Sequence, residues 1–179
     1  MFSHKTTGLV VVDIQGRLAE CVDQSDAFVA SCEKLICAAR ALDLPVIWLE
    51  QIPEKLGPTH PSIRELLQPL QPITKYTFNA FDTPAFCDAV ASSGLSDWLV
   101  CGTEAHVCVF QTALSLFQHG YNIQVPEDCI ASRTFANKAR AIARLQASGV
   151  TITSLEMCLF ELIKDCRHPK FQTILKLIK

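Results

Sequence analysis

The sequence predicts an α/β fold in which helices cover both faces of a parallel β-sheet, and two observations lead to this prediction. First, apolar runs such as 8–14 and 97–102 are continuous rather than alternating, which is typical of strands buried on both faces. Second, segments with helical spacing separate these runs, and such alternation produces parallel sheets with right-handed crossovers. No repeat, low-complexity tract or linker divides the chain, so we expect one domain covering 1–179.

Each predicted helix is supported by an apolar stripe or by residues that suit its ends. The segment 25–42 repeats apolar residues at helical spacing. Thr83 before Pro84 suits a helix start, and Gly120 and Gly149 suit helix ends. The expected strands are 8–14, 45–50, 73–76, 97–102, 122–126 and 150–154, and the expected helices are 25–42, 84–93, 107–119, 135–148, 156–164 and 169–178.

Composition narrows the classes of protein and partner. Apolar residues make up 49% and charged residues 19% of the chain, which indicates a folded globular domain. The net charge is −2 and no basic stripe is visible, so we expect no nucleic-acid partner. No apolar run could span a bilayer, so we expect no membrane partner. The apolar content favours a homo-oligomer with one face buried between subunits.

The cysteines indicate a reducing compartment. The chain contains nine, and the polar residues 1–7 show no signal peptide, so the thiols are expected to be reduced in the cytoplasm. A mitochondrial location is the alternative. There is no CxxC pair and no Cys/His spacing typical of zinc, so neither a metal nor another cofactor is expected.

The most distinctive segment is 99–112, which reads as a buried strand, a glycine-containing turn and a helix with Cys108 in its opening turn. The first amides of a helix lack partners inside the helix and carry partial positive charge. A thiol in this place can have a lowered pKa, and the free N–H groups can bind an oxyanion. This turn is therefore a candidate nucleophile site.

Two further residues lie at equivalent places in the predicted sheet. Asp13 is near the end of the first strand and Lys75 near the end of the third, and ligands bind at the carboxyl ends of such strands. Burial raises the pKa of an aspartate and makes it a competent base, but a buried carboxylate needs a partner such as Lys75. We therefore expect Asp13 to take the proton of Cys108 and later to return it to the leaving group.

Three residues at the same edge are candidate substrate contacts: Gln15, Glu50 and Phe78. Gln15 and Glu50 could instead bond backbone near the strand ends, and Phe78 could pack in the core. The proline-rich connection 51–71 is expected to be irregular, and long connections of this kind tend to be functional.

Three separated blocks then agree in order and spacing with a known family. VDIQ at 12–15, KYTFNAF at 75–81 and GTEAHVCV at 102–109 resemble the isochorismatase-like, or cysteine hydrolase, superfamily, and are most similar to isochorismatase-domain-containing proteins. The resemblance implies a three-layer Rossmann-like fold with a six-stranded parallel sheet in the order 3-2-1-4-5-6. It also implies a catalytic triad of Asp13, Lys75 and Cys108. A cis peptide between Thr103 and Glu104 is implied as well, with the N–H groups of Glu104 and Cys108 forming the oxyanion hole.

The implied activity is a metal-independent cysteine hydrolase that cleaves a small amide or related C–N bond through a thioester. The nicotinamidase branch uses an Asp-x-His metal motif, and the segment 50–60 has one histidine and no such motif. Three alternatives stay open: vinyl-ether hydrolysis with Asp13 acting alone, a non-catalytic member, and RNA cleavage.

Overall fold

A parallel sheet of seven strands forms the centre of the computed structural model, which describes all residues, Met1–Lys179. Six strands follow the order β3-β2-β1-β4-β5-β7, and the short β6 pairs with β4 beyond the end of β5. The predicted fold class and order are confirmed, with β7 as the sixth predicted strand. The strands are β1 (Thr7–Val12), β2 (Val46–Gln51), β3 (Ile73–Lys75), β4 (Asp97–Thr103), β5 (Asn122–Pro126), β6 (Ile130–Ala131) and β7 (Thr151–Thr153).

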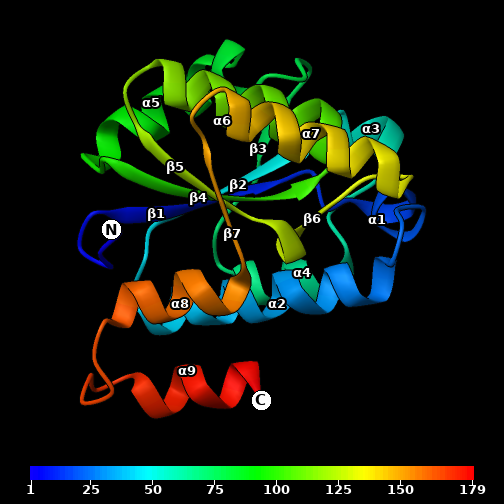
Figure 1. Cartoon of the computed structure of the whole chain (residues 1–179). Helices are drawn as coiled ribbons and strands as arrows, with labels where there is room; N and C mark the ends of the chain where they lie inside the picture. Colours follow the sequence, from blue (N-terminus) through cyan, green and yellow to red (C-terminus); the bar gives the residue numbers. More distant parts are fainter.

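Helices cover both faces of this sheet (Figure 1). One apolar core lies between the sheet and α2, α4 and α8, with α9 packed outside them, and a second lies between the sheet and α5, α6 and α7. None of the helices is both long and apolar enough to cross a membrane. The helices of the first face are α2 (Ser25–Ala41), α4 (Pro61–Leu67), α8 (Leu155–Ile163) and α9 (Phe171–Ile178), and those of the second are α5 (Pro84–Ser93), α6 (Phe110–Gln118) and α7 (Phe135–Ala147).

The connection 51–71 is more regular than the sequence indicated. It contains α3 (Pro53–Leu56) and α4 (Pro61–Leu67), each with proline in its first turn. Elsewhere in the chain, α1 (Gly16–Glu20) is another short helix that was not predicted. These helices have four to seven residues, which is too short for an apolar period to be recognised, and proline suits a helix start. The predicted irregular loop was therefore wrong for these residues.

The close approach of β4 to β1 leaves no room for a side chain at Gly102. This residue pairs with Val12, has φ +124°, and a Cβ built on it would lie 1.9 Å from the Val12 carbonyl oxygen. The absence of a Cβ therefore lets the end of β4 lie against the strand end that carries Asp13.

Gly102→Ala should lower the free energy of unfolding by about 3 kcal/mol, because the clash involves backbone that cannot turn away. Gly94→Ala is the matched control: Gly94 also has positive φ, 65°, but a Cβ there meets nothing within 4 Å. We expect that control to lose only about 1–2 kcal/mol. Urea unfolding of both variants measures the difference, and equal losses would show that the contact with Val12 is unimportant.

Candidate active site

A buried ion pair lies at the carboxyl edge of the sheet. Lys75 Nζ donates to Asp13 Oδ2 at 2.7 Å, and both side chains are at most 1% exposed. The same ammonium donates to Gln51 Oε1 at 2.6 Å and to the carbonyl of Thr77 at 3.2 Å. Its three N–H groups are thus matched by three acceptors, as a buried charge requires.

The other oxygen of Asp13 is not held in this way. Oδ1 is buried and has no hydrogen-bond partner of normal geometry. Asp13 itself is a non-glycine residue with φ +49°, and Thr103 Oγ1 donates to its carbonyl at 2.6 Å. The end of β4 therefore holds the Asp13 backbone, while Lys75 holds one of its two carboxylate oxygens.

Cys108 completes the group. It lies in the π-helical turn Ala105–Val109 that precedes α6, is 7% exposed, and is near enough to Asp13 and Lys75 for each of them to shift the pKa of its thiol. The three predicted catalytic residues are thus brought together from three separate strand ends.

The thiol is not the activated thiolate that the sequence suggested. Burial, followed by the charge of Asp13, raises the pKa of Cys108 to about 12, and the opposing effect of Lys75 is smaller. The expected lowering was therefore wrong: a thiol beside a carboxylate in a buried site stays protonated. The thiol is therefore protonated at pH 7, so the proton must be removed during the reaction.

Asp13 is suited to remove it. Burial raises the pKa of Asp13 above the ordinary value, while the charge of Lys75 and its hydrogen bond lower it. A carboxylate with a raised pKa is a stronger base, and Lys75 still favours its ionised form. The expectation of a raised pKa for Asp13 is confirmed.

Glu50 does not share a face with the triad. Its Oε1 accepts hydrogen bonds from Thr59 N and Oγ1, both at 2.7 Å, and Trp48 Nε1 donates to the same Thr59 hydroxyl. Glu50 therefore points with Trp48 into the side of the sheet that α2 and α4 cover. Side chains alternate along a strand, so the next residue, Gln51, faces the triad instead. The predicted substrate contact by Glu50 is replaced by a bond to the Thr59 loop.

Of the other two candidate substrate contacts, Gln15 is buried and Phe78 is exposed. The Gln15 side chain is fully buried, donates to the carbonyls of Gln51 and Gly57, and accepts from Gln51 N. This is the backbone-bonding alternative considered for it. Phe78 is 56% exposed on the segment that follows β3, so it is not a core residue and its substrate contact stays a prediction.

The turn before Cys108 has the predicted backbone. The Thr103–Glu104 peptide is cis. Val107 N–H and Val109 N–H donate to the Glu104 carbonyl, whereas no acceptor for the Glu104 N–H is present in the protein. The Glu104 side chain accepts a hydrogen bond from Arg133 Nε at 2.9 Å, which ties the turn to the segment before α7. The role of the Glu104 and Cys108 amides as an oxyanion hole stays a prediction.

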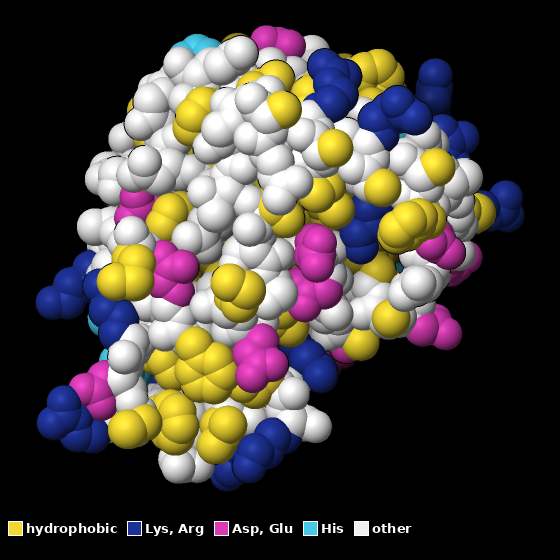
Figure 2. Space-filling model, viewed as in Figure 1, with side chains coloured by type: hydrophobic (Ala, Val, Ile, Leu, Met, Phe, Trp, Pro, Cys, Tyr) yellow, Lys and Arg dark blue, Asp and Glu magenta, His cyan; other side chains and the backbone are white.

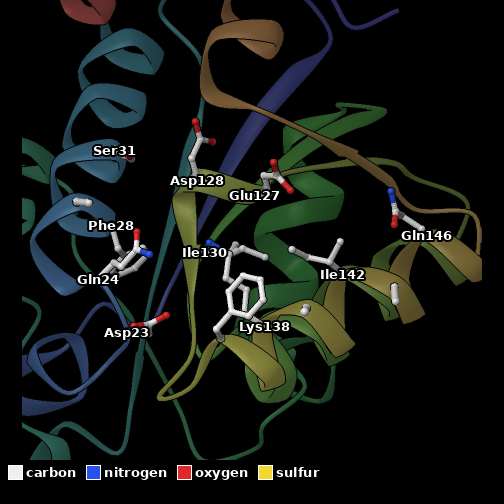
Figure 3. A pocket seen from close by; sticks show the side chains of 14 residues that line it. Asp23, Gln24, Phe28, Ser31, Glu127, Asp128, Ile130, Lys138, Ile142 and Gln146 are labelled. Atoms are coloured by element: carbon white, nitrogen blue, oxygen red, sulfur yellow. The ribbon is translucent and has the colours of Figure 1, made fainter.

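One cavity beside the sheet is separate from the triad. It has a volume of about 520 Å³ and lies between α2 and α7 (Figure 3), with Phe28 and Ile142 on its apolar part and Glu127 and Asp128 on its acidic part. None of the triad residues lines it. No group of three or more His, Cys, Asp or Glu side chains is arranged to hold a metal ion.

The family model described as the isochorismatase domain matches residues 7–157. The chain belongs to the isochorismatase family. Isochorismatase domain-containing protein 2A of Mus musculus is 32% identical over 172 residues, which are 96% of this chain and 82% of that protein.

Solved structures of similar proteins support the family fold over the whole chain. The MAR1 ribonuclease of Caenorhabditis elegans is 31% identical, with a TM-score of 0.92 and coverage of 99% of this chain and 91% of that one. YcaC from Pseudomonas aeruginosa, solved with hexane-2,5-diol and covalent acrylamide, is 25% identical, with a TM-score of 0.93 and coverage of 98% and 90%.

Gln51 is the site residue that the sequence reasoning missed. Gln51 follows Glu50 at the end of an apolar run, and Glu50 was predicted as the substrate contact because it is charged. The strand period would have placed the two residues on opposite faces, but only the position of α2 and α6 tells which face holds the triad.

Proposed function

We propose that this isochorismatase-family protein is a metal-independent cysteine hydrolase that cleaves a small amide or related C–N bond through a thioester. The observation that carries the proposal is that the two oxygens of the Asp13 carboxylate have different environments. Oδ2 is held by Lys75, Oδ1 is buried without a hydrogen-bond partner, and Asp13 is near enough to the protonated Cys108 to shift the pKa of its thiol. This is the arrangement that a nucleophile and its general base require.

The reaction needs no other charged group. Asp13 Oδ1 accepts the Cys108 proton as Sγ bonds to the amide carbon, and the carbonyl electrons move to oxygen. The Glu104 and Cys108 N–H groups stabilise that oxyanion. Collapse re-forms the carbonyl and breaks the C–N bond, with Asp13 returning the proton to the leaving nitrogen. Water, deprotonated by Asp13, then attacks the thioester; the acid leaves and the proton returns to Sγ. Lys75 stays an ammonium throughout.

A relative with the same fold supports a covalent route. YcaC from Pseudomonas aeruginosa was solved with covalent acrylamide, which is itself a small primary amide. For this chain the corresponding inference is that a small electrophile reaches Cys108 although the residue is only 7% exposed.

A panel of small amides and carbamoyl compounds tests the proposal by ammonia release. Wild type should hydrolyse at least one of them, and hydroxylamine added during turnover should intercept the thioester as a hydroxamate. Cys108→Ala should form no acyl adduct and show no turnover, whereas Cys166→Ala, which removes an exposed thiol, should match wild type. Hydrolysis by Cys108→Ala at the wild-type rate would contradict the thioester route. Activity that is retained in Cys108→Ala but lost in Asp13→Ala would favour the ether-hydrolase alternative, in which Asp13 acts alone.

RNA cleavage is a second candidate because the relative from Caenorhabditis elegans is described as a ribonuclease. Basic side chains also gather along α7, and Figure 2 shows a group of them at one edge of the molecule. The net charge of −2 opposes this reading. RNA binding through phosphates would weaken steeply between 50 and 200 mM salt, so titration of a labelled RNA at both concentrations separates the two functions.

We also propose that the protein forms a homo-oligomer. Large apolar side chains stay exposed on several parts of the isolated chain, and surfaces of this kind are commonly buried between subunits. The most exposed of them, apart from the terminal Met1, are Tyr76, Phe78, Phe135 and Met157.

A further inference from the structure

Gln51 is the third member of a buried polar network, and it touches the ion pair directly. It ends β2 and is only 4% exposed. Its Oε1 accepts from Lys75 Nζ at 2.6 Å, and its Nε2 donates to the Tyr76 carbonyl at 3.0 Å. Its backbone N–H donates to Gln15 Oε1 at 2.6 Å. The amide group therefore has one permitted orientation, with the oxygen toward Lys75.

This orientation decides where the lysine N–H groups point. The Lys75 ammonium has three of them, and Gln51 and the Thr77 carbonyl accept two. One N–H is left for Asp13, and it is directed to Oδ2. Oδ1, the oxygen that faces no lysine N–H, is the one without a partner.

We propose that Gln51 is a positioning residue for the hydrolytic reaction: by accepting one Lys75 N–H, it confines the lysine to Asp13 Oδ2 and keeps Oδ1 free for the Cys108 proton. This inference rests on the proposed function, because the free oxygen matters only if Asp13 is the base. Gln51 does not contact the reacting atoms and acts through Lys75.

An uncharged acceptor is needed at this place. A carboxylate at position 51 would compete with Asp13 for Lys75 and add negative charge beside the base. Glu50, although it points to the other face of the sheet, already contributes to raising the pKa of Asp13. An apolar side chain would have the opposite effect, since the released Lys75 N–H would turn to the nearest unpartnered acceptor, Asp13 Oδ1, and hydrogen bonding to a carboxylate lowers its pKa.

The test is the pH dependence of Cys108 carbamidomethylation by iodoacetamide, followed by peptide mapping of the intact, folded protein. The thiol displaces iodide, an S–C bond forms, and the proton passes to Asp13, so the rate falls at acidic pH where Asp13 is protonated. We expect Gln51→Glu to move the midpoint of this acid limb up by about one pH unit and Gln51→Met to move it down by a similar amount. At a pH on the limb each shift is about a tenfold change in rate.

The controls separate this inference from the proposed function. Gln172→Glu adds the same charge on the exposed first turn of α9 and should leave the midpoint unchanged. In Asp13→Asn the limb should instead follow ionisation of the Cys108 thiol alone, with its midpoint at a higher pH; if it keeps the wild-type midpoint there, Asp13 is not the base and the proposed function fails. If the limb moves in Asp13→Asn but keeps its wild-type midpoint in the Gln51 variants, only the role of Gln51 is overturned.

A purely structural role for Gln51 has a different signature. Loss of the bond to the Tyr76 carbonyl alone would lower stability in both variants without moving the midpoint, and equal shifts in one direction would likewise contradict the proposal. If Gln51→Glu does not fold, because it buries a second carboxylate, the neutral Gln51→Met decides: a downward shift supports the inference and an unchanged midpoint overturns it.

Discussion

Asp13→Asn should slow amide hydrolysis by about 10²–10⁴-fold, because it removes the group that takes and returns the proton. The same variant should not protect Cys108 from iodoacetamide at neutral pH. The charge of Asp13 is one cause of the raised pKa of the thiol, and Lys75 opposes it, so the pKa of Cys108 should fall once the carboxylate is gone. Hydrolysis and thiol reactivity are therefore expected to separate in this variant.

The measurement compares ammonia release from the best amide of the panel with the alkylation rate of Cys108. Asp43→Asn is the matched control, because Asp43 is also an aspartate with positive φ, 56°, but is exposed and precedes β2, at the opposite end of that strand from Gln51. It should retain wild-type hydrolysis. A loss of both hydrolysis and alkylation in Asp13→Asn would indicate a damaged fold rather than a missing base, and circular dichroism would show it.

Lys75→Met should reduce the free energy of unfolding by about 3–5 kcal/mol at neutral pH, since it leaves Asp13 as a buried, unpaired charge. The loss should depend on pH. Lys75 lowers the pKa of Asp13, so without it burial raises that pKa further. A carboxylate with a raised folded-state pKa contributes stability below its unfolded pKa and loses it as the pH rises through the folded value. The variant should accordingly be closest to wild type under acidic conditions.

Urea unfolding at pH 5 and pH 8 checks both the size and the sign of this effect. The double variant Asp13→Asn/Lys75→Met should recover most of the loss, because replacing both members of a buried pair is far less costly than removing one. Lys176→Met, on the exposed side of α9, should change stability by no more than about 0.5 kcal/mol. A loss in Lys75→Met that is the same at both pH values would contradict the assignment of its cause to an ionised Asp13.

Much of the fold was predictable because its signals are local. The six predicted apolar runs became strands within two residues of the expected bounds, and the capping residues near Pro84 and Gly149 marked real helix ends. The helices of 51–71 and the two-residue strand β6 were not predictable in this way. They are too short to carry a period, and neighbouring elements hold them in place.

The sequence by itself determined which residues meet: Asp13, Lys75 and Cys108 follow three strands whose carboxyl ends converge at one edge of a parallel sheet. Only the tertiary structure decided how they behave. Gln51 rather than Glu50 joins them, because the packing of helices on each face sets which side of β2 faces the triad. Cys108 is protonated rather than ionised, because burial and a neighbouring carboxylate outweigh the effect of Lys75. Both outcomes depend on groups that are far apart in the chain, and the local sequence does not determine how close those groups lie in space.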